Sequence, residues 1–584
     1  MRVIGIVYEH DATVCLMEDG RITFCQSEER FDRVKQSFGF PFRTLEHVYA
    51  HVAPRDSIDL AVIYETALPH EGAVLREECE PSGEWSPASG RSAMRTMKDL
   101  ALTTAWGSRL SEWRIRRRQN DPSARRRAHA FFARLLGLPA GKVVFMDHHL
   151  AHAWSVVPSV LPWGRALVFT LDGGGDGLCA TVSLVEEGRL TRLSACAERH
   201  SLGYFYADTA TVLGMNGSED EFKVMALAGY ASREEVEPLL AKLRGLLSID
   251  AKGEWNSVPT AGARFGALAE ACRFARFDVT AGAVQSLTEE LISRWVAHWV
   301  AKTGCGDIAV AGGVFMNVKA SQKVAQLPDV SRLFVMPSAG DESCAIGAAA
   351  WGTRQLDASA PLEPLGDLYL GVEYGEREVA EAIAASGATS RYEISRPADI
   401  NREVARLLAD NRIVARCAGR MEFGARALGN RSILAHPGHL ENVRRINDAI
   451  KERDFWLPFA PAILEEEMAR YVAGYEKAFA PYMCIAFDST EVARGDLQAA
   501  MHAGDLTLRP QAIRREWNRD FHEIVSAFRE LTGTGAVLNT SFNLHGEPIV
   551  CSPADAIRTT DLSAIEHLML GGHLLSKRRE GAAR

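Results

Sequence analysis

Residues 166–177 have the sequence Ala-Leu-Val-Phe-Thr-Leu-Asp-Gly-Gly-Gly-Asp-Gly. The apolar run at 166–171 predicts a buried strand that ends at Asp172, and the glycines after it predict a loop. Glycine has no side chain, so this loop can bring backbone N–H groups close to a phosphate. The stretch therefore predicts an α/β fold with a phosphate-binding loop at the end of a strand.

The same order of elements occurs near the N-terminus. Residues 3–24 and residues 166–191 both predict a strand, a polar loop, a second strand, an acidic-glycine turn and a third strand. The first loop carries His10, and the second carries the glycine run. Two such hairpins that face each other across a nucleotide are the plan of the actin/Hsp70/sugar-kinase superfamily, so we expect a duplicated N-terminal domain.

A group of histidines follows a short apolar strand at 143–146. Asp147 is a suitable N-cap, so we expect a helix to begin at His148. His148 and His152 are four positions apart and share one face of that helix, whereas His149 points elsewhere. Two imidazoles on one face can chelate a divalent metal. Together with the phosphate loop, they indicate a nucleotide-dependent enzyme.

Two further loops complete the expected nucleotide site. A strand is predicted at 308–311, and the glycine-rich loop after it, at 312–317, suits an adenosine. The loop at 337–343 contains Asp341 and leads into a helix of small residues at 345–351. Small residues there allow the helix to pack closely on the sheet.

The second half of the chain has arginines next to predicted strands. Residues 356–366 have the composition of a linker, and alternating helices and strands are expected beyond it. An apolar strand at 413–416 precedes the stretch 418–433, where three arginines lie in a glycine-rich turn. Such arginines can make bidentate contacts to a small doubly charged anion, and ligands bind near sheet ends in α/β folds. The sequence therefore predicts an anion and nucleotide site in this half.

Composition bounds the class of protein. The chain has 584 residues, which is enough for two or three domains, and its 47% hydrophobic and 24% charged content is typical of a globular protein. The net charge of −9 disfavours a general nucleic-acid binder. The 11 cysteines contain no CxxC pair, which is typical of a reduced, cytoplasmic protein. The N-terminus predicts a strand rather than a signal peptide, and no apolar run reaches the roughly 18 residues that a membrane span needs.

From end to end, the chain resembles the NodU/CmcH family of O-carbamoyltransferases, which act on antibiotics and Nod factors. The matching segments keep the family's order, and they are 10–12, 27–31, 148–153, 172–177, 221–228, 312–317, 340–341, 420–433, 451–453, 458–461 and 539–543. The resemblance implies that residues 1–355 form a duplicated actin/Hsp70-like (ASKHA) domain, as in tRNA threonylcarbamoyl transferases, with subdomains at about 1–163 and 164–355. Residues 367–584 are then a YrdC-like α/β domain, whose signature appears as Lys451-x-Arg453 and Ser541-x-Asn543.

The resemblance also implies an ATP-dependent transfer in two steps. Carbamoyl phosphate and ATP with Mg²⁺ would bind in the YrdC-like domain, where the carbamate attacks the α-phosphate of ATP to give carbamoyladenylate and pyrophosphate. Positive side chains would offset the charge that develops on the phosphates. The residues that the resemblance implies for this site are Arg420, Arg426, Arg431, Lys451, Arg453, Arg509, Ser541 and Asn543.

Carbamoyladenylate would then pass to the N-terminal domain. The implied metal ligands there are His148, His152, Asp172 and Asp341. The family metal is iron, although the same ligands would suit zinc or manganese. His149 stays open as an alternative to His148 as a ligand. His10, with a reference pKa near neutrality, would be the general base that takes the proton of the acceptor hydroxyl. The residues expected around the adenylate are Gly173, Gly174, Gly175, Asp176, Lys223, Gly312, Gly313 and Asn317.

The acceptor is not identified by the sequence. We expect a hydroxyl of a small natural product in antibiotic or other secondary metabolism, bound by segments such as 30–110 and 195–290. No nucleic-acid or membrane partner is expected, and both a monomer and a homodimer stay open. One alternative is a tRNA threonylcarbamoyl transferase, which the net negative charge and the fused arginine-rich domain disfavour. The other is an ATP-gated binding module of the actin/Hsp70 type, which would need no Lys-x-Arg and Ser-x-Asn pair.

Overall fold

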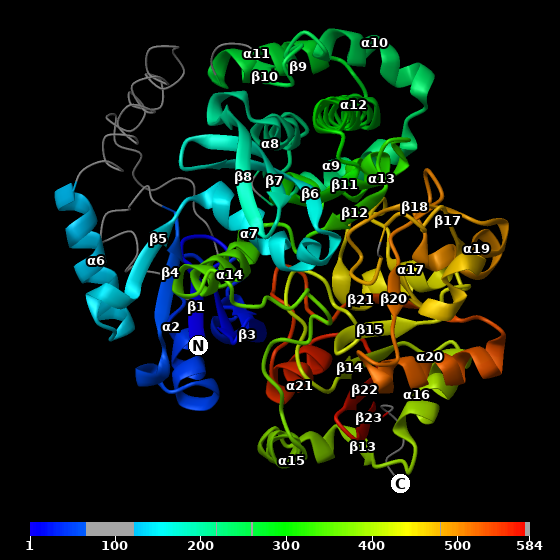
Figure 1. Ribbon diagram of the computed structural model, residues 1–584. Coiled ribbons are helices and arrows are strands. Elements are labelled where there is room, and N and C mark those ends of the chain that lie inside the picture. The colour runs from blue at the N-terminus through cyan, green and yellow to red at the C-terminus, as the bar shows by residue number, and fades with distance from the viewer. Residues whose placement is uncertain (66–121, 218, 258–260, 479, 579–584) are drawn as a thin grey trace, which may run out of the picture. The chain divides into compact units, whose positions relative to one another are not determined.

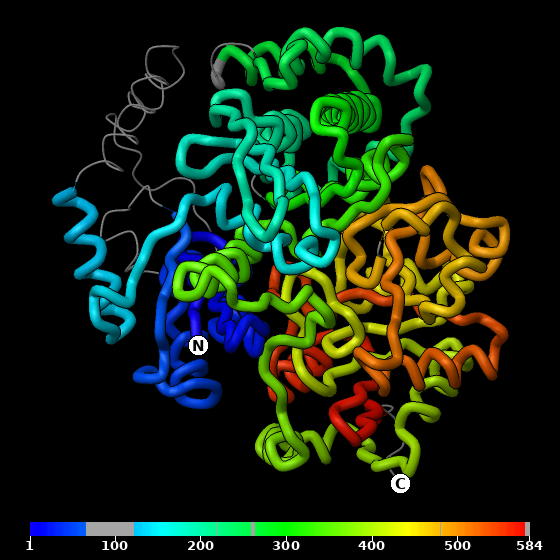
Figure 2. The backbone as a smooth tube through the Cα atoms, in the orientation of Figure 1, coloured from blue at the N-terminus to red at the C-terminus, as the bar shows by residue number. Residues whose placement is uncertain are grey.

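The computed structural model describes residues 1–65, 122–217, 219–257, 261–478 and 480–578 (Figure 1). Residues 66–110, which are part of the segment expected to bind the acceptor, lie outside this description. The chain forms two compact units, each of mixed α/β structure, and its course through each is drawn in Figure 2. The N-terminal unit comprises Met1–Glu28 and Ser37–Pro364, and the C-terminal unit comprises Glu29–Gln36 and Leu365–Arg584.

Five strands form the first sheet of the N-terminal unit, in the order β3-β2-β1-β4-β5. β1, β2 and β3 form an antiparallel meander, while β4 and β5 run parallel to β1. The loop between β1 and β2 carries His10. The strands are β1 (Arg2–Val7), β2 (Thr13–Glu18), β3 (Arg21–Ser27), β4 (Leu60–Tyr64) and β5 (Val143–Met146).

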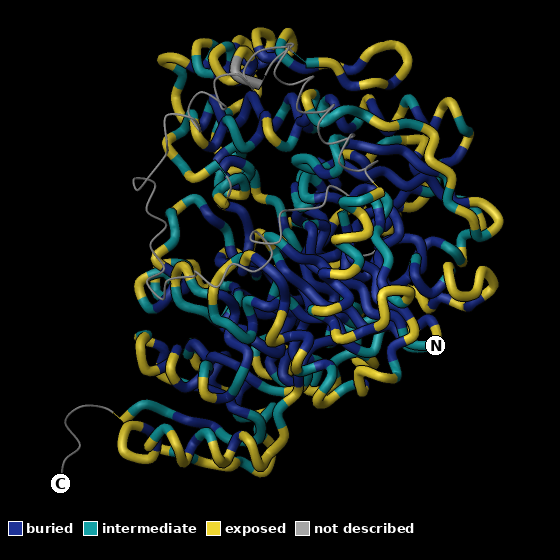
Figure 3. Tube along the Cα trace, turned by 90° about the vertical axis from the view of Figure 1, so that its left-hand side faces the viewer, coloured by how far each residue is buried: buried dark blue, intermediate teal, exposed yellow. Residues whose placement is uncertain are grey.

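The second sheet of this unit repeats the same topology. Its order is β12-β11-β6-β7-β8, in which β6, β7 and β8 form the antiparallel meander and β11 and β12 add parallel strands. The predicted internal repeat is therefore confirmed, and the central strands of both sheets are buried. Figure 3 marks the buried parts of the chain in dark blue and the exposed parts in yellow. The strands are β6 (Arg165–Gly175), β7 (Leu178–Glu186), β8 (Arg189–Ala197), β11 (Asp307–Ala311) and β12 (Arg332–Val335).

The glycine run after Asp172 does not form the predicted loop. β6 continues through Gly175, which pairs with Leu178 across a turn of only two residues, although the pairing with β7 is irregular between Leu171 and Gly175. Those two residues, Asp176 and Gly177, both have positive φ, at 52° and 80°. Asp-Gly is a favoured sequence for this type of tight hairpin turn, so the strand extends instead of ending at Asp172.

Two helices lie against these two sheets and against each other (Figure 1). They are α7 (His148–Val160) and α14 (Cys344–Leu356). α14 packs on β1, β2 and β4, and α7 packs on β6 and β11. Glycines permit this packing, because a Cβ on Gly347 of α14 would overlap the carbonyl oxygen of Ala151 in α7, and a Cβ on Gly5 of β1 would overlap a carbonyl of α14. The predicted helix of small residues is thus confirmed, together with its close packing on a sheet.

Further helices and one short hairpin complete the N-terminal unit. They are α2 (Phe42–His47), α6 (Pro122–Leu136), α8 (Leu202–Val212), α9 (Glu221–Leu227), α10 (Arg233–Leu243), β9 (Leu247–Ile249), β10 (Trp255–Ser257), α11 (Ala261–Cys272), α12 (Phe277–Thr303) and α13 (Val318–Gln326). Within the described residues of either unit, no helix has the length and apolar character that crossing a bilayer would require.

An eight-stranded mixed sheet forms the centre of the C-terminal unit, in the order β13-β23-β22-β14-β15-β21-β16-β20. Neighbouring residues Val414 and Ala415 of β14 belong to different apolar clusters, so helices and loops cover both faces of the sheet. The strands are β13 (Tyr392–Ser395), β14 (Val414–Cys417), β15 (Arg431–Ala435), β16 (Ala460–Leu464), β20 (Gln511–Ile513), β21 (Ala536–Ser541), β22 (His567–Leu570) and β23 (His573–Lys577). A small second sheet contains β17 (Val472–Ala473), β18 (Phe487–Ser489) and β19 (Thr507–Leu508). The helices are α1 (Glu29–Asp32), α15 (Glu376–Ala385), α16 (Ile400–Ala409), α17 (Glu441–Ile446), α18 (Met468–Tyr471), α19 (Glu491–Asp496), α20 (Arg519–Thr532) and α21 (Pro553–Asp561).

The segment Glu29–Gln36 belongs to the C-terminal unit although it lies early in the chain. The buried Arg30 donates a hydrogen bond to the carbonyl of Gly424 at 2.9 Å. Arg33 donates to the carbonyls of Pro548 and Ile549 at 2.8 and 2.7 Å. The sequence did not predict this excursion, because charged residues at the end of a hairpin are typical of a solvated surface.

The predicted linker packs on the N-terminal unit. Residues 357–366 form no helix or strand. However, Ala360 and Leu362 are buried, and the backbone N–H of Glu363 donates to the carbonyl of Gly20 at 2.9 Å. These contacts hold the first part of the 357–366 segment against the N-terminal unit. The segment therefore has the composition of a flexible linker but is packed in the structure.

Gly347→Ala should destabilise the protein by about 1–3 kcal/mol, because the added methyl group forces α7 and α14 apart. The measurement is the free energy of unfolding in denaturant. Gly266→Ala is the matched control, since a Cβ at this position of helix α11 meets nothing within 4 Å. That control should be neutral, or more stable by about 0.5–1 kcal/mol. Equal stability of the two variants would contradict the proposed role of Gly347.

Candidate metal centre and anion site

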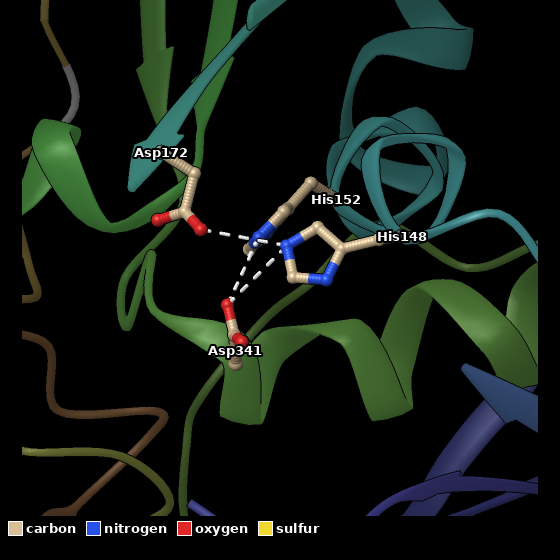
Figure 4. A group of neighbouring side chains, drawn as sticks. All are labelled: His148, His152, Asp172 and Asp341. Carbon is tan, nitrogen blue, oxygen red and sulfur yellow. Dashed lines mark ion pairs between the residues drawn. The ribbon is translucent and has the colours of Figure 1, made fainter. Parts of the chain in front are cut away.

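Four side chains from separate parts of the chain converge in the N-terminal unit (Figure 4). The carboxylate of Asp147 accepts a hydrogen bond at 2.7 Å from a backbone N–H in the first turn of α7, so the predicted N-cap is confirmed. The helix begins at His148 and presents His148 and His152 to one side. Asp172 lies in β6, and Asp341 begins the short 3₁₀ helix before α14.

The donor atoms of this cluster are close to one another. The Nε2 atom of His148 lies 3.4 Å from Asp172 Oδ2 and 3.6 Å from Asp341 Oδ1. The Nε2 atom of His152 lies 3.2 Å from the same oxygen of Asp341. Ligands that bind one divalent ion at about 2.0–2.2 Å are themselves roughly 3–3.5 Å apart. These three pairs are near this spacing, and all four donor atoms lie within 4.8 Å of one another, so small movements of the side chains would allow them to bind one ion.

The chemistry of the four groups also fits a cation. The Nε2 atoms of His148 and His152 are buried, and neither has a hydrogen-bond partner within the described residues. An unpaired buried nitrogen is unfavourable, and a metal ion would use both lone pairs. Burial lowers the pKa of His148, but the carboxylates of Asp341 and Asp172 raise it by more, to about 10. Two imidazoles and two carboxylates accept iron, zinc or manganese, so the donor set does not select one of them.

Glycines around the cluster make room for its ligands. A Cβ on Gly175 would overlap the ring of His148. Gly312 has φ of 100° and packs against the backbone of β6, and the N–H of Gly313 donates to Asp172 Oδ1 at 2.7 Å. This hydrogen bond orients the carboxylate and leaves Oδ2 facing His148. Part of the expected nucleotide loop thus supports the metal ligands.

His149, the open alternative to His148, lies outside the cluster. Its Nδ1 atom lies 2.8 Å from the hydroxyl of Thr170, which in turn contacts Thr181. Burial lowers the pKa of His149 to about 3, so the ring stays neutral at physiological pH. The Nε2 atom of His149 is also buried without a hydrogen-bond partner among the described residues, but of the three histidines in α7 only His148 and His152 bring a nitrogen close to Asp172 and Asp341, so the geometry favours His148 as the ligand.

His10 lies beside the cluster, but its charge differs from expectation. Its Nε2 atom is 3.3 Å from Asp341 Oδ2, and its Nδ1 atom is 3.2 Å from Asp11 Oδ2. The hydrogen bond to Asp11, with the charge of Asp341, raises the pKa of His10 to about 10. The expectation of a pKa near neutrality is wrong for this structure, because both ring nitrogens face carboxylates. A divalent ion on Asp341 would oppose this rise.

Three other residues expected around the adenylate, Asp176, Lys223 and Asn317, contact other parts of the protein. Asp176 Oδ2 accepts a hydrogen bond from the backbone N–H of His148 at 2.9 Å, so this residue fixes the start of α7. Lys223 forms an ion pair with Asp220 at 3.1 Å. Asn317 caps α13 and exchanges two hydrogen bonds with Gln285, at 2.8 and 3.0 Å. The fold thus already uses the amide of Asn317.

A second site lies in the C-terminal unit, where the Lys-x-Arg and Ser-x-Asn segments meet. The Nζ atom of Lys451 donates to Asn543 Oδ1 at 2.7 Å and to Ser541 Oγ at 3.1 Å. Ser541 also donates to Asn543 Oδ1 at 2.7 Å. Burial lowers the pKa of Lys451 well below its usual value, and the charge of Arg453 adds to this effect. The amine is therefore held in a fixed position by two neutral side chains.

Three arginines add to the positive charge of this site. Burial lowers the pKa of Arg509 well below its usual value, and Arg426 and Arg453 both contribute. Burial and Arg426 likewise lower the pKa of Arg453, to about 10. Within the described residues, neither Arg453 nor Arg509 forms an ion pair with a carboxylate, so the cluster favours an anionic ligand.

Arg420 and Arg431 have a different environment from these three. Arg420 donates to the carbonyls of Leu370 and Gly371 at 3.0 and 2.9 Å. Arg431 is buried, and its guanidinium donates to the carbonyls of Ala418, Gly419, Asn430 and Cys551. These contacts hold the glycine-rich turn in shape. A role for both arginines in holding phosphate stays a prediction.

Two further residues support this turn and were not predicted. Glu422 is buried and accepts from the backbone N–H groups of Leu428 and Arg431 at 2.7 and 3.1 Å. Arg416 is buried in β14 and donates to the carbonyl of Gly429 and to Asn430 Oδ1, at 2.8 and 2.6 Å. The sequence held a signal for each. Arg416 is a charged residue in an apolar strand, and Glu422 is a carboxylate in a turn rich in arginine.

Family models match both parts of the chain. The model described as carbamoyltransferase N-terminus covers residues 2–350, and the model described as carbamoyltransferase C-terminus covers residues 405–577. The chain belongs to the carbamoyltransferase family. The resemblance seen in the sequence is thereby confirmed.

Individual relatives agree with this carbamoyltransferase assignment. The nodulation protein NolNO of Sinorhizobium fredii is 32% identical over 98% of this chain and 79% of its own length. The 3′-hydroxymethylcephem-O-carbamoyltransferase of Amycolatopsis lactamdurans is 28% identical over 66% of this chain and 71% of its own length. Among solved structures, full-length HypF in its phosphate- and nucleotide-bound form is 13% identical over 62% of this chain and 56% of its own, with a TM-score of 0.35. This structural likeness is too weak to carry an argument.

Removing both histidine ligands should remove a bound metal. We expect elemental analysis of the purified protein to find one tightly held divalent ion per chain, and His148→Ala/His152→Ala to lose it because half of the donor set is gone. The control is His149→Ala, which should keep the ion. Unchanged metal content in the double variant would reject the site, and loss in the His149 variant would move the ligand to that residue.

Proposed function

We propose that this carbamoyltransferase family member is an ATP-dependent O-carbamoyltransferase. It would use carbamoyl phosphate as the donor, carbamoyladenylate as the intermediate and a hydroxyl of a small natural product as the acceptor. The observation that carries the proposal is the contact of Lys451 with Ser541 and Asn543 beside Arg453 and Arg509. It provides a buried positive site, without ion pairs from Arg453 or Arg509 to described carboxylates, in a family that transfers carbamoyl groups.

The first step would take place in the C-terminal unit. Water cleaves the bond between the carbonyl carbon and the bridging oxygen of carbamoyl phosphate, and phosphate and carbamate form. A carbamate oxygen then attacks the α-phosphate of ATP, and the bond to the β-phosphate breaks to release pyrophosphate. Lys451, which is buried, and Arg453 and Arg509, which are half-buried, would act by charge, because attraction to phosphate oxygens is stronger away from bulk water. Ser541 and Asn543 keep the Lys451 amine in place.

The second step would take place at the metal centre of the N-terminal unit. A divalent ion held by His148, His152, Asp172 and Asp341 supplies Lewis-acid polarisation of the carbamoyl carbonyl. With a divalent ion bound to Asp341, the rise in the pKa of His10 would be opposed, and the neutral imidazole would take the proton of the acceptor hydroxyl. The hydroxyl oxygen would then bond to the carbamoyl carbon, and AMP would leave. Asp341 orients His10, since one of its oxygens faces the imidazole and the other faces the metal ligands.

The finer assignments belong to the same proposal. The duplicated strand topology supports an actin/Hsp70-like architecture for the N-terminal unit, and the Lys451, Ser541 and Asn543 contacts support a YrdC-like C-terminal unit. Iron is proposed from the family alone. A secondary metabolite is proposed as acceptor because one relative is named a cephem O-carbamoyltransferase, and no nucleic-acid partner is proposed because the net charge is −9.

The activation step should depend on Arg453. We expect Arg453→Ala to lose the release of pyrophosphate from ATP that depends on carbamoyl phosphate, because a half-buried positive charge proposed to bind phosphate is removed. The fold should stay intact, which circular dichroism can check. Arg444→Ala is the matched control, since its side chain is 88% exposed and its ion-pair partner among the described residues is Asp448. Pyrophosphate release at the wild-type rate in the Arg453 variant would place the activation site elsewhere.

The transfer step should depend on His10 without affecting activation. We expect His10→Asn to release pyrophosphate normally but to transfer the carbamoyl group about 10²–10⁴-fold more slowly, the usual effect of losing a general base. Pyrophosphate is followed without acceptor, and the carbamoylated product is followed after a candidate hydroxyl compound is added. His51→Asn, an exposed histidine of the same unit, is the control. Equal loss of both signals would assign His10 to activation or to the fold.

A further inference from the structure

From the last residue of β21 onward, every second residue, namely Ser541, Asn543 and His545, contacts Lys451. Ser541 Oγ and Asn543 Oδ1 accept hydrogen bonds from its Nζ atom at 3.1 and 2.7 Å. His545 Nδ1 lies 3.1 Å from its backbone carbonyl oxygen. The same short segment thus holds both ends of the lysine, and the familiar Ser-x-Asn pair extends to Ser541-x-Asn543-x-His545.

The carbonyl that His545 contacts occupies a special place in the backbone. Lys451 is the last residue of a π-helical turn at Asn447–Lys451, so its carbonyl oxygen has no partner within that helix. The next residue, Glu452, has left-handed backbone angles, with φ of 47° and ψ of 35°. This conformation is strained for a residue with a side chain, and it reverses the chain between Lys451 and Arg453. A hydrogen bond to the carbonyl before it stabilises the reversal.

The direction of this hydrogen bond fixes the imidazole. A carbonyl oxygen only accepts, so Nδ1 carries the proton and donates to Lys451. The side chain of His545 is exposed, in contrast to Lys451, which is 1% exposed. His545 therefore adds little to the core, and its contact with the active-site backbone is the main role that the structure gives it.

We propose that His545 is a positioning residue of the carbamoyl-phosphate and ATP site, and that it acts through the backbone of Lys451. Its Nδ1–H would hold the end of the π-helical turn so that Lys451 and Arg453 both face the substrate phosphates. This inference rests on the function proposed above and adds a residue that neither the family signature nor the positive charge of the site indicates.

Three substitutions at one position separate this role from a general structural one. His545→Asn keeps an N–H donor at nearly the position of Nδ1, His545→Gln places its amide nearer to the position of Nε2, and His545→Ala has no donor. We expect the Ala and Gln variants to raise the KM for carbamoyl phosphate by about ten- to a hundredfold in the pyrophosphate assay, because the lysine and arginine lose their alignment. The Asn variant should stay close to the wild-type value. The wild-type protein and the three variants should have the same melting temperature, because the side chain of His545 is exposed.

A second measurement is independent of activity. Trace labelling with acetic anhydride, followed by peptide mass spectrometry, reports how accessible the Lys451 amine is. Labelling should rise in the Ala and Gln variants and stay at the wild-type level in the Asn variant. If wild-type protein releases no pyrophosphate but labelling follows this pattern, the proposed reaction fails and the positioning role stands. Equal KM values in all variants, equal losses in Asn and Gln, or unchanged labelling in Ala would each overturn the positioning role.

Discussion

The metal cluster depends on how closely two helices approach each other. α7 supplies both histidines and α14 follows Asp341, and the two helices touch where Gly347 faces the carbonyl of Ala151. α14 also lies on β1, whose Gly5 permits a second backbone contact. Because His10 follows the end of β1, the same packing sets the distance between His10 and Asp341. The lack of a side chain at Gly347 and Gly5 therefore allows the close packing that places the residues of the cluster.

The two units bury charge of opposite sign. In the N-terminal unit the metal ligands Asp172 and Asp341 have carboxylate neighbours, and burial together with Glu9 raises the pKa of Glu65 to about 8. In the C-terminal unit a buried lysine and several arginines lie together. In the N-terminal unit the imidazoles of His10, His148 and His152 lie beside these carboxylates and offset part of their charge, whereas Arg453 and Arg509 have no carboxylate partner among the described residues. A cation at the first site and phosphate groups at the second are the ligands proposed above.

Local patterns in the sequence predicted what depends on local physics. The spacing of His148 and His152, the cap at Asp147 and the repeated hairpins all follow from helix and strand periodicity, and the structure confirms them. Long-range contacts were not predictable in the same way. Arg420 and Arg431 looked like free anion ligands, yet both bind backbone carbonyls that only the folded turn presents. The charge of His10 was also missed, because it depends on carboxylates that tertiary packing brings to the ring.

The excursion of residues 29–36 has a consequence for modularity. The polypeptide changes unit at residues 28–29, at 36–37 and again at 364–365. A gene split at the last of these positions would yield a C-terminal product without Arg30 and Arg33, whose side chains bind the carbonyls of Gly424, Pro548 and Ile549. A C-terminal unit expressed from residue 365 onward would therefore lack two of its own side-chain contacts, so the boundary at 364–365 does not separate two complete units.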